Sequence, residues 1–183
     1  MGSGKEILNV IDEQGNIIGE ATREEIHKRG LLHREIHVWI YTPKKEIIFQ
    51  KRSPNKDTFP NLLDASVGGH VDLGDSFEAA AVRELEEETG IKVKKEDLKL
   101  YKMKRSDRKD PVTQSHNNAL RALYIYKFAG GTSGLKTEAR DGAGFEFWPI
   151  SRLKNLSPTE AARFIPEIIE GYLPMFEKIC ATE

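Results

Sequence analysis

The sequence predicts an α+β protein in which helices flank a mixed or antiparallel sheet. Strand-like segments rich in β-branched and aromatic residues recur along the chain, bounded by turn residues. Helical segments occur among them without the regular βαβ alternation of a parallel sheet. The chain has 183 residues, of which 31% are charged and 38% hydrophobic, as is typical of globular proteins. We therefore expect a single domain over residues 1–183, with its core at about 31–155.

The N-terminal part, residues 6–30, is expected to form a hairpin followed by a short helix. The hairpin strands are "ILNVID" and "NIIGEA", with a turn at Gly15 between them. The helix is "TREEIHKRG", in which Thr22 is a suitable N-terminal cap and Gly30 a suitable stop.

The middle of the chain carries the clearest helix signal. Two expected strands, "IHVWIYT" and "EIIFQKR", are followed by a polar loop, "SPNKDTFPN", and by a short strand that enters a glycine-rich bend. The helix should then run over 76–89 and end at Gly90. Asp75 and Glu78 are spaced as a helix cap and its reciprocal partner.

The last third of the chain returns to strands and then to helix. "DLKLYKMKR" and "NNALRALYIYKF" are expected strands, separated by a loop, "SDRKDPVTQSH". A glycine-rich loop leads to the strand "FEFWPI". The segment 157–181 should be helical, with breaks at Pro166 and Pro174.

Composition narrows the partners of the protein. The net charge of −1 and the pI near 6.5 give no overall field for nucleic acid or for a membrane, so we expect neither as a partner. The lone cysteine, Cys180, excludes an intramolecular disulfide. The N-terminus lacks the apolar run of a signal peptide, which favours a cytoplasmic protein. The oligomeric state, monomer or homodimer, stays open.

The segment "RELEEETG" places four glutamates in five consecutive positions of the expected helix. On a helical wheel with Ala81 at zero, Phe77 and Leu85 lie about 40° to either side and mark the buried stripe. Glu88 lies about 20° and Glu84 about 60° from Ala81 on the same wheel, so both point toward the core. Three further residues lie between the border and the solvent side: Arg83, Glu86 and Glu87.

Core-facing carboxylates are costly unless a cation compensates them. An arginine or lysine of the chain could do so, and a solvated acidic face is the general alternative for a charge run. A hard divalent cation such as Mg²⁺ is favoured, because a few carboxylates bind it while it keeps water and substrate phosphates as further ligands. The pattern therefore predicts a metal cluster.

The segment "GHVDLGDSFEAAAVRELEEETGI" closely resembles the Nudix box, with Asp75 where that family has its first glutamate. The matching positions are Gly69, Arg83, Glu84, Leu85, Glu87, Glu88, Gly90 and Ile91. The resemblance implies an α/β/α sandwich with a mixed sheet and a loop-helix-loop metal site. It also implies hydrolysis of a diphosphate linked to another group, with Mg²⁺ or Mn²⁺ as the metal.

The resemblance assigns the roles within the box. Glu84, Glu87 and Glu88 match the metal ligands, often joined by the carbonyl of Gly69. Glu87, Glu84 and Arg83 would then carry the catalysis. The general base in the family is a box glutamate or a carboxylate of a distal loop. We favour Glu87 over three later candidates, which are Glu138, Asp141 and Glu146.

From roughly Ile11 to Leu153 the chain also resembles type I isopentenyl-diphosphate isomerases and their Nudix hydrolase relatives. His33 and His70 match histidines that bind a metal. His70 is also a candidate to bind the small-molecule diphosphate substrate. Arg52 and Lys56 match residues that hold the substrate diphosphate. A helix-end or turn role is the alternative for His33 and His70, and a plain surface charge is the alternative for Arg52.

The sequence differs from the isomerases at the positions of their catalytic residues. Gly68 stands at the position of the catalytic cysteine, and Leu63 at that of the tryptophan over the carbocation. Asn117 and Asn118 stand near the glutamates of a later strand, and Cys180 is no evident substitute for the cysteine. We therefore expect a Nudix hydrolase on an isomerase-like scaffold. An isomerase-like activity and a non-catalytic diphosphate-binding module are the alternatives.

Overall fold

The computed structural model describes residues 6–56, 58–131, 134–136, 142–166 and 168–181. The described strands are β1 (Ile7–Ile11), β2 (Ile17–Thr22), β3 (His33–Tyr41), β4 (Glu46–Arg52), β5 (Leu63–Asp64), β6 (Val67–His70), β7 (Lys99–Lys109), β8 (His116–Lys127) and β9 (Gly142–Pro149). The described α-helices are α1 (Arg23–Arg29), α2 (Phe77–Thr89), α3 (Ile150–Leu153), α4 (Pro158–Ala161) and α5 (Ile168–Ala181).

Strand β3 is the centre of a mixed nine-stranded sheet. It runs parallel to β8 over its whole length, from the pair His33 and Ala119 to the pair Tyr41 and Lys127. On its other side β3 pairs antiparallel with β6, and near its two ends with β1 and β4. The predicted mixed sheet is confirmed.

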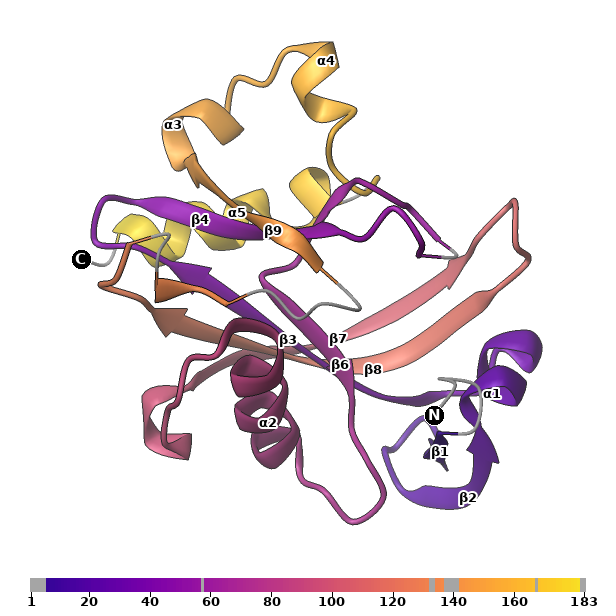
Figure 1. The fold of residues 1–183 in the computed structure, drawn as a ribbon. Helices are drawn as coiled ribbons and strands as arrows, with labels where there is room; N and C mark the ends of the chain where they lie inside the picture. The colour runs from indigo at the N-terminus through magenta and orange to yellow at the C-terminus, as the bar shows by residue number, and fades with distance from the viewer. Residues whose placement is uncertain (1–5, 57, 132–133, 137–141, 167, 182–183) are drawn as a thin grey trace.

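One helix covers each face of this sheet, so the domain is an α/β/α sandwich (Figure 1). Side chains alternate along β3, as a strand requires. Ile36 and Val38 pack in the core beneath α2, whereas Trp39 packs in the core against α5. Each polar side chain of β3 therefore lies on one face of the sheet or on the other. Groups of residues on opposite faces are separated by the sheet itself.

The predicted caps of α1 are confirmed, and that of α2 is corrected. Thr22 and Glu25 form a capping box at the start of α1, and Gly30 ends that helix with a φ of 65°. Gly90, with a φ of 72°, ends α2 as predicted. The N-terminal cap of α2 is Ser76, whose hydroxyl accepts from the backbone N–H of Ala79, so the cap was not the aspartate before it.

Two further predictions need correction. The segment expected as a loop after residue 105 continues β7 to Lys109, because it pairs with the start of β8 down to His116. Pro166 lies between α4 and α5 as predicted, but Pro174 lies inside α5 without breaking it. Burial of the flanking residues Tyr172 and Met175 against the sheet offsets the hydrogen bond that the proline removes.

Within the part of the chain that the structure describes, no helix combines the length and the apolar character needed to cross a lipid bilayer.

Candidate active site and a histidine cluster

The acidic end of α2 lies directly against the backbone of β6. The side chain of Glu84 occupies the space beside Gly69, so a Cβ at that glycine would overlap the Glu84 carboxyl group. Glu88, one turn further along α2, is buried at 6% exposure and accepts a hydrogen bond of 3.1 Å from the Gln50 side-chain amide. The helical wheel therefore placed both carboxylates correctly, and the match of Gly69 to the box has a steric reason.

Arg83 is the main counter-ion of the site. Its guanidinium lies 2.7 Å from Glu84 and 3.3 Å from Glu87, and it also donates to the backbone carbonyl of His70 at 3.2 Å. It also pairs with two aspartates of the preceding loop, Asp72 at 3.1 Å and Asp75 at 3.7 Å. Asp75, which stands where the family has its first glutamate, thus lies beside Arg83 at the helix start.

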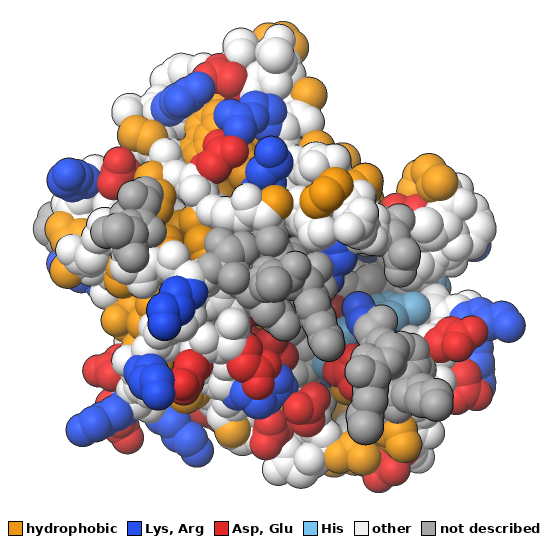
Figure 2. Space-filling view, in the orientation of Figure 1, with side chains coloured by type: hydrophobic (Ala, Val, Ile, Leu, Met, Phe, Trp, Pro, Cys, Tyr) orange, Lys and Arg blue, Asp and Glu red, His pale blue; other side chains and the backbone are white. Residues whose placement is uncertain are grey.

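Figure 2 shows acidic side chains gathered over α2, with basic ones among them. Glu87 is the open member of the three box glutamates, with 55% of its side chain exposed. Glu84 is largely buried, and burial raises the pKa of its carboxyl group to about 7 against the opposing effect of Arg83. The site thus holds one carboxylate in water and two carboxylates largely removed from it.

The shifted Glu84 pKa predicts how the stability of the metal-free protein depends on pH. Between pH 4.5 and about 7 the folded protein keeps a proton on Glu84 that the unfolded chain has lost. The contribution of this group to stability therefore falls as pH rises through that window, by at most about 3 kcal/mol. Chemical denaturation in EDTA at pH 5 and pH 8 should show this loss in wild type relative to Glu84→Gln. Equal pH dependence in the two proteins would contradict the shift.

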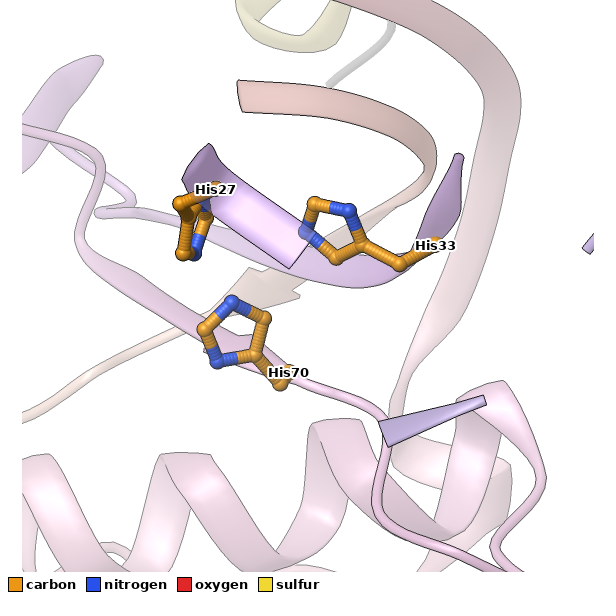
Figure 3. A group of neighbouring side chains, drawn as sticks. All are labelled: His27, His33 and His70. Carbon is orange, nitrogen blue, oxygen red and sulfur yellow. The ribbon is translucent and has the colours of Figure 1, made fainter. Parts of the chain in front are cut away.

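A second constellation occupies the other face of the sheet. Among the described residues, one group of His, Cys, Asp and Glu side chains brings three or more possible ligand atoms within 4.8 Å of one another: His27, His33 and His70. Figure 3 shows the three rings facing one another from α1, β3 and β6. The three glutamates of α2 do not form such a group: the Arg83 guanidinium binds Glu84 and Glu87, whereas Glu88 accepts from Gln50.

The predicted diphosphate-holding residues lie in and beside one loop. Arg52, at the end of β4, donates to Asp64 at 2.9 Å and to the carbonyl of Thr58 at 2.8 Å, so it fixes the loop to β5. Lys56 lies within that loop, and its backbone N–H donates to Ser53 at 3.2 Å. Arg52 therefore has a structural role, and its contact with substrate stays a prediction.

Of the later candidates for the general base, Glu146 lies away from the acidic site. It faces the α5 side of the sheet beside its strand partner Phe49, and its two oxygens bind Arg163 at 2.6 Å and the Trp148 indole at 3.1 Å. Glu138 and Asp141 lie outside the described residues. Glu87 therefore remains the favoured base among the residues whose surroundings the structure shows.

The structure also shows the surroundings of the residues at which the chain differs from the isomerases. Gly68 is exposed on the face opposite Glu84, next to the His37 ring. Leu63 is buried in the core, and Asn118 donates to the carbonyl of Gly30 at 2.8 Å. Cys180 is buried in α5, in the core between that helix and the sheet.

The sequence did not identify three residues around these sites. Gln50, which binds Glu88, lies on a neighbouring strand, and a glutamine at a strand position carries no signal of that contact. His27 and Glu35 join His33 and His70 only through the packing of α1, β3 and β6. The sequence offered two signals for this grouping: a histidine within the short helix, and a carboxylate two residues after His33.

A mixed sheet between two helices, with an acidic helix packed on a glycine strand, defines an α/β/α domain built around a loop-helix-loop site. The family model of the NUDIX domain matches residues 31–170, which is most of the chain. The chain therefore belongs to the Nudix family.

Three relatives are similar to this chain over different shares of its length. An uncharacterized Nudix hydrolase of Clostridium acetobutylicum is 43% identical over 97 residues, covering 51% of this chain and 47% of the relative. An isopentenyl-diphosphate Delta-isomerase 2 of Photorhabdus laumondii is 39% identical over 86 residues, covering 47% and 49%. A prenyl-diphosphate phosphatase of Methanosarcina mazei is 26% identical over 175 residues, covering 95% and 97%. The chain thus spans about half the length of most of these curated relatives.

The fold has a counterpart among solved structures. A Deinococcus radiodurans protein, DR0079, superimposes with a TM-score of 0.67 over 94% of this chain and 98% of its own, at 21% sequence identity. This likeness concerns the fold, which agrees with the predicted sandwich.

Proposed function

We propose that the protein is a Mg²⁺-dependent pyrophosphohydrolase that cleaves a small diphosphate compound. One observation carries the proposal. Two carboxylates, Glu84 and Glu88, are held on the buried side of α2, and burial has raised the pKa of Glu84 to about 7. Carboxylates kept out of water in this way are stabilised by a bound cation, and Mg²⁺ prefers oxygen ligands of this kind.

The donor set fits the metal that the family uses. Glu84 and Glu88 supply carboxylate oxygens, and the Gly69 carbonyl belongs to the strand against which Glu84 packs. When bound, Mg²⁺ or Mn²⁺ would neutralise diphosphate oxygens and lower the pKa of an attacking water. Arg83 holds Glu84 and Glu87 on one side of the helix. In this proposal the exposed Glu87 accepts the proton of the attacking water as general base, and its exposure to solvent supports that role.

The proposed substrate is a nucleoside diphosphate derivative or a similar small diphosphate, with Arg52, Lys56 and His70 as candidates to contact it. The prenyl-diphosphate phosphatase covers nearly the whole chain, which adds prenyl diphosphates to the compounds to be tested. Both classes share the phosphoric anhydride on which the acidic site would act.

The test is a screen of nucleoside diphosphate derivatives and prenyl diphosphates with Mg²⁺, in which phosphate release is read with and without added phosphatase. We expect metal-dependent cleavage of at least one compound, abolished by EDTA. Binding of these compounds without any turnover would reject the hydrolase and favour the alternative of a non-catalytic binding module.

The relation to an isomerase makes isomerisation the second candidate. That reaction adds a proton to a carbon–carbon double bond and needs an acid and an aromatic face beside the cation. Gly68 supplies no acid and the buried Leu63 no aromatic ring. We expect no deuterium from D₂O in the carbons of isopentenyl diphosphate, measured by mass spectrometry after long incubation. Carbon-bound deuterium with the wild-type protein would favour the isomerase hypothesis. Gly68→Cys alone should not create isomerase activity, because the aromatic ring would still be missing.

A further inference from the structure

An apolar groove lies between the segment that carries α3 and α4 and the helix α5, on the face of the sheet that α5 covers (Figure 1). Its volume of about 660 Å³ is within the range of sites that bind small molecules. Ten of its twelve lining residues are apolar, and four of these are only partly buried by the rest of the chain: Leu62, Leu156, Ile169 and Leu173. Figure 2 shows apolar side chains between charged ones at the top of the view, over α3 and α4. Nothing in the hydrolase proposal uses this groove.

The outer wall of the groove is held in place by polar contacts that lie outside it. Arg152 of α3 donates to Glu160 of α4 at 2.7 Å, which links the two short helices across the segment between them. Glu160 also forms a capping box with Ser157 at the start of α4. The Arg152 guanidinium lies 4.2 Å from the ring centroid of Trp148, so the wall is attached to β9 as well. The groove is therefore formed before any ligand enters it, which lowers the cost of binding.

Charge is absent from the buried part of the described lining. Lys154 and Glu170 are both exposed, and Lys154 Nζ lies 2.7 Å from a carboxylate oxygen of Glu177. The deepest lining residues include Phe164 and Ile165, which are 3% and 6% exposed. A charged or strongly hydrogen-bonding group placed against them would lose its hydration without gaining a partner. The lining therefore suits a hydrocarbon chain.

One wall residue connects the groove to the candidate diphosphate-binding residues. Leu62 ends the loop that follows β4, and its carbonyl accepts from the backbone N–H of Arg52 at 2.9 Å. Lys56 lies within the same loop. The carbonyl of Leu63, the next residue, accepts from the N–H of Ile165 at 3.0 Å, so this short strand also borders the groove. The groove therefore lies beside the loop that is proposed to hold the diphosphate.

We infer that the groove binds the hydrocarbon part of a diphosphate ester whose chain is longer than five carbons. The inference rests on the proposed hydrolase function and narrows its substrate class. Arg52 and Lys56 would contact the phosphates, and the groove would bury the chain. Burial of apolar surface is non-directional and grows with the area removed from water, so affinity should rise with chain length. A nucleoside would instead place its ribose and base edges against the same apolar lining, which disfavours it here.

The test is isothermal titration of the full-length protein, in Mg²⁺, with two analogues in which a methylene group replaces the oxygen between the two phosphorus atoms. One analogue carries a five-carbon prenyl chain and the other a fifteen-carbon prenyl chain, and neither can be cleaved at the bridge. We expect the longer analogue to bind at least about 10-fold more tightly, because more of its apolar surface is buried.

Two variants change the groove itself. Leu173→Gln places an amide in the groove and should weaken binding of the longer analogue by at least about 10-fold, while the shorter one stays within about twofold of wild type. Ala162→Phe fills the groove from the end of α4 and should have the same effect, so a folding defect of one variant does not decide the result. The matched control is Ile18→Gln, which changes an apolar side chain that is 66% exposed on β2, and it should keep both affinities within about twofold.

The outcomes separate this inference from the hydrolase proposal. Equal affinity of the wild type for the two analogues, or no binding of either, would overturn the inference. A wild-type dimer that Leu173→Gln converts to a monomer would also overturn it, because a second copy would then cover the groove. Cleavage of nucleoside derivatives without binding that depends on chain length rejects the groove alone. Such binding without cleavage of any compound supports the groove and rejects the hydrolase.

Discussion

Replacing Glu87 with glutamine is expected to lower kcat by about 10²- to 10⁴-fold, the range that a positioned general base contributes. The amide keeps the size of the side chain but can neither accept the proton of a water nor bind Mg²⁺ as a carboxylate does. Stability should change by less than about 1 kcal/mol, because Glu87 is exposed and its pair with Arg83 is a surface ion pair. The measurement is steady-state phosphate release, with thermal unfolding of the same samples.

Glu86 offers a matched control on the same helix. It is also exposed, it pairs with Lys92 at 3.2 Å, and it lies outside the box pattern. Glu86→Gln should keep kcat within about twofold, because it removes the same charge without removing a group of the site. Glu87→Gln with at least one third of wild-type activity would reject Glu87 as base and ligand.

Arg121→Met is expected to destabilise the metal-free protein by about 3–5 kcal/mol, the cost of leaving a buried charge unpaired. Arg121 is 11% exposed, and its partner Glu35 lies 2.6 Å away at 10% exposure. The same guanidinium donates to the Tyr172 hydroxyl at 3.2 Å, so it also links β8 to α5. Urea denaturation in EDTA measures the loss.

Two variants show whether the loss comes from the buried pair. Glu35→Gln combined with Arg121→Met should be more stable than Arg121→Met alone, because no charge is then left unpaired. Arg152→Met removes an exposed arginine that pairs with Glu160 at 2.7 Å, and it should cost less than about 1 kcal/mol. If Arg121→Met costs no more than Arg152→Met, the buried pair contributes little.

The sequence predicted most of the fold and the burial of two box glutamates, because both depend on local periodicity. The helical wheel of α2 depends only on the repeat of the helix. It correctly placed Glu88 and Leu85 in the core and Glu86 in solvent. The strands followed from alternation and turn residues in the same way. The cap of α2 was assigned one residue early, since Asp75 and Ser76 are both good caps and the sequence alone does not distinguish them; in the structure Ser76 caps the helix and Asp75 pairs with Arg83.

The histidine cluster could be predicted only in part, because its geometry depends on contacts between distant segments. The resemblance to isomerases indicated His33 and His70, but His27 reaches them only because α1 packs at the end of the sheet. Glu35 carries no comparable signal in the sequence. Its ion pair with Arg121 depends on the parallel register of β3 with β8, which brings the two residues opposite each other, and no local pattern contains that register.

Strand β6 has four residues, and its last two supply opposite faces of the sheet: Gly69 lies against Glu84, and His70 faces the other histidines. Insertion or deletion of one residue in this strand would exchange the two faces and place an imidazole against the carboxylates. A change of length would therefore disturb both faces at once, whereas a substitution disturbs only the face on which its side chain lies. The alternation of side chains between the two faces of the strand, rather than any single side chain, keeps the carboxylates of α2 apart from the histidines.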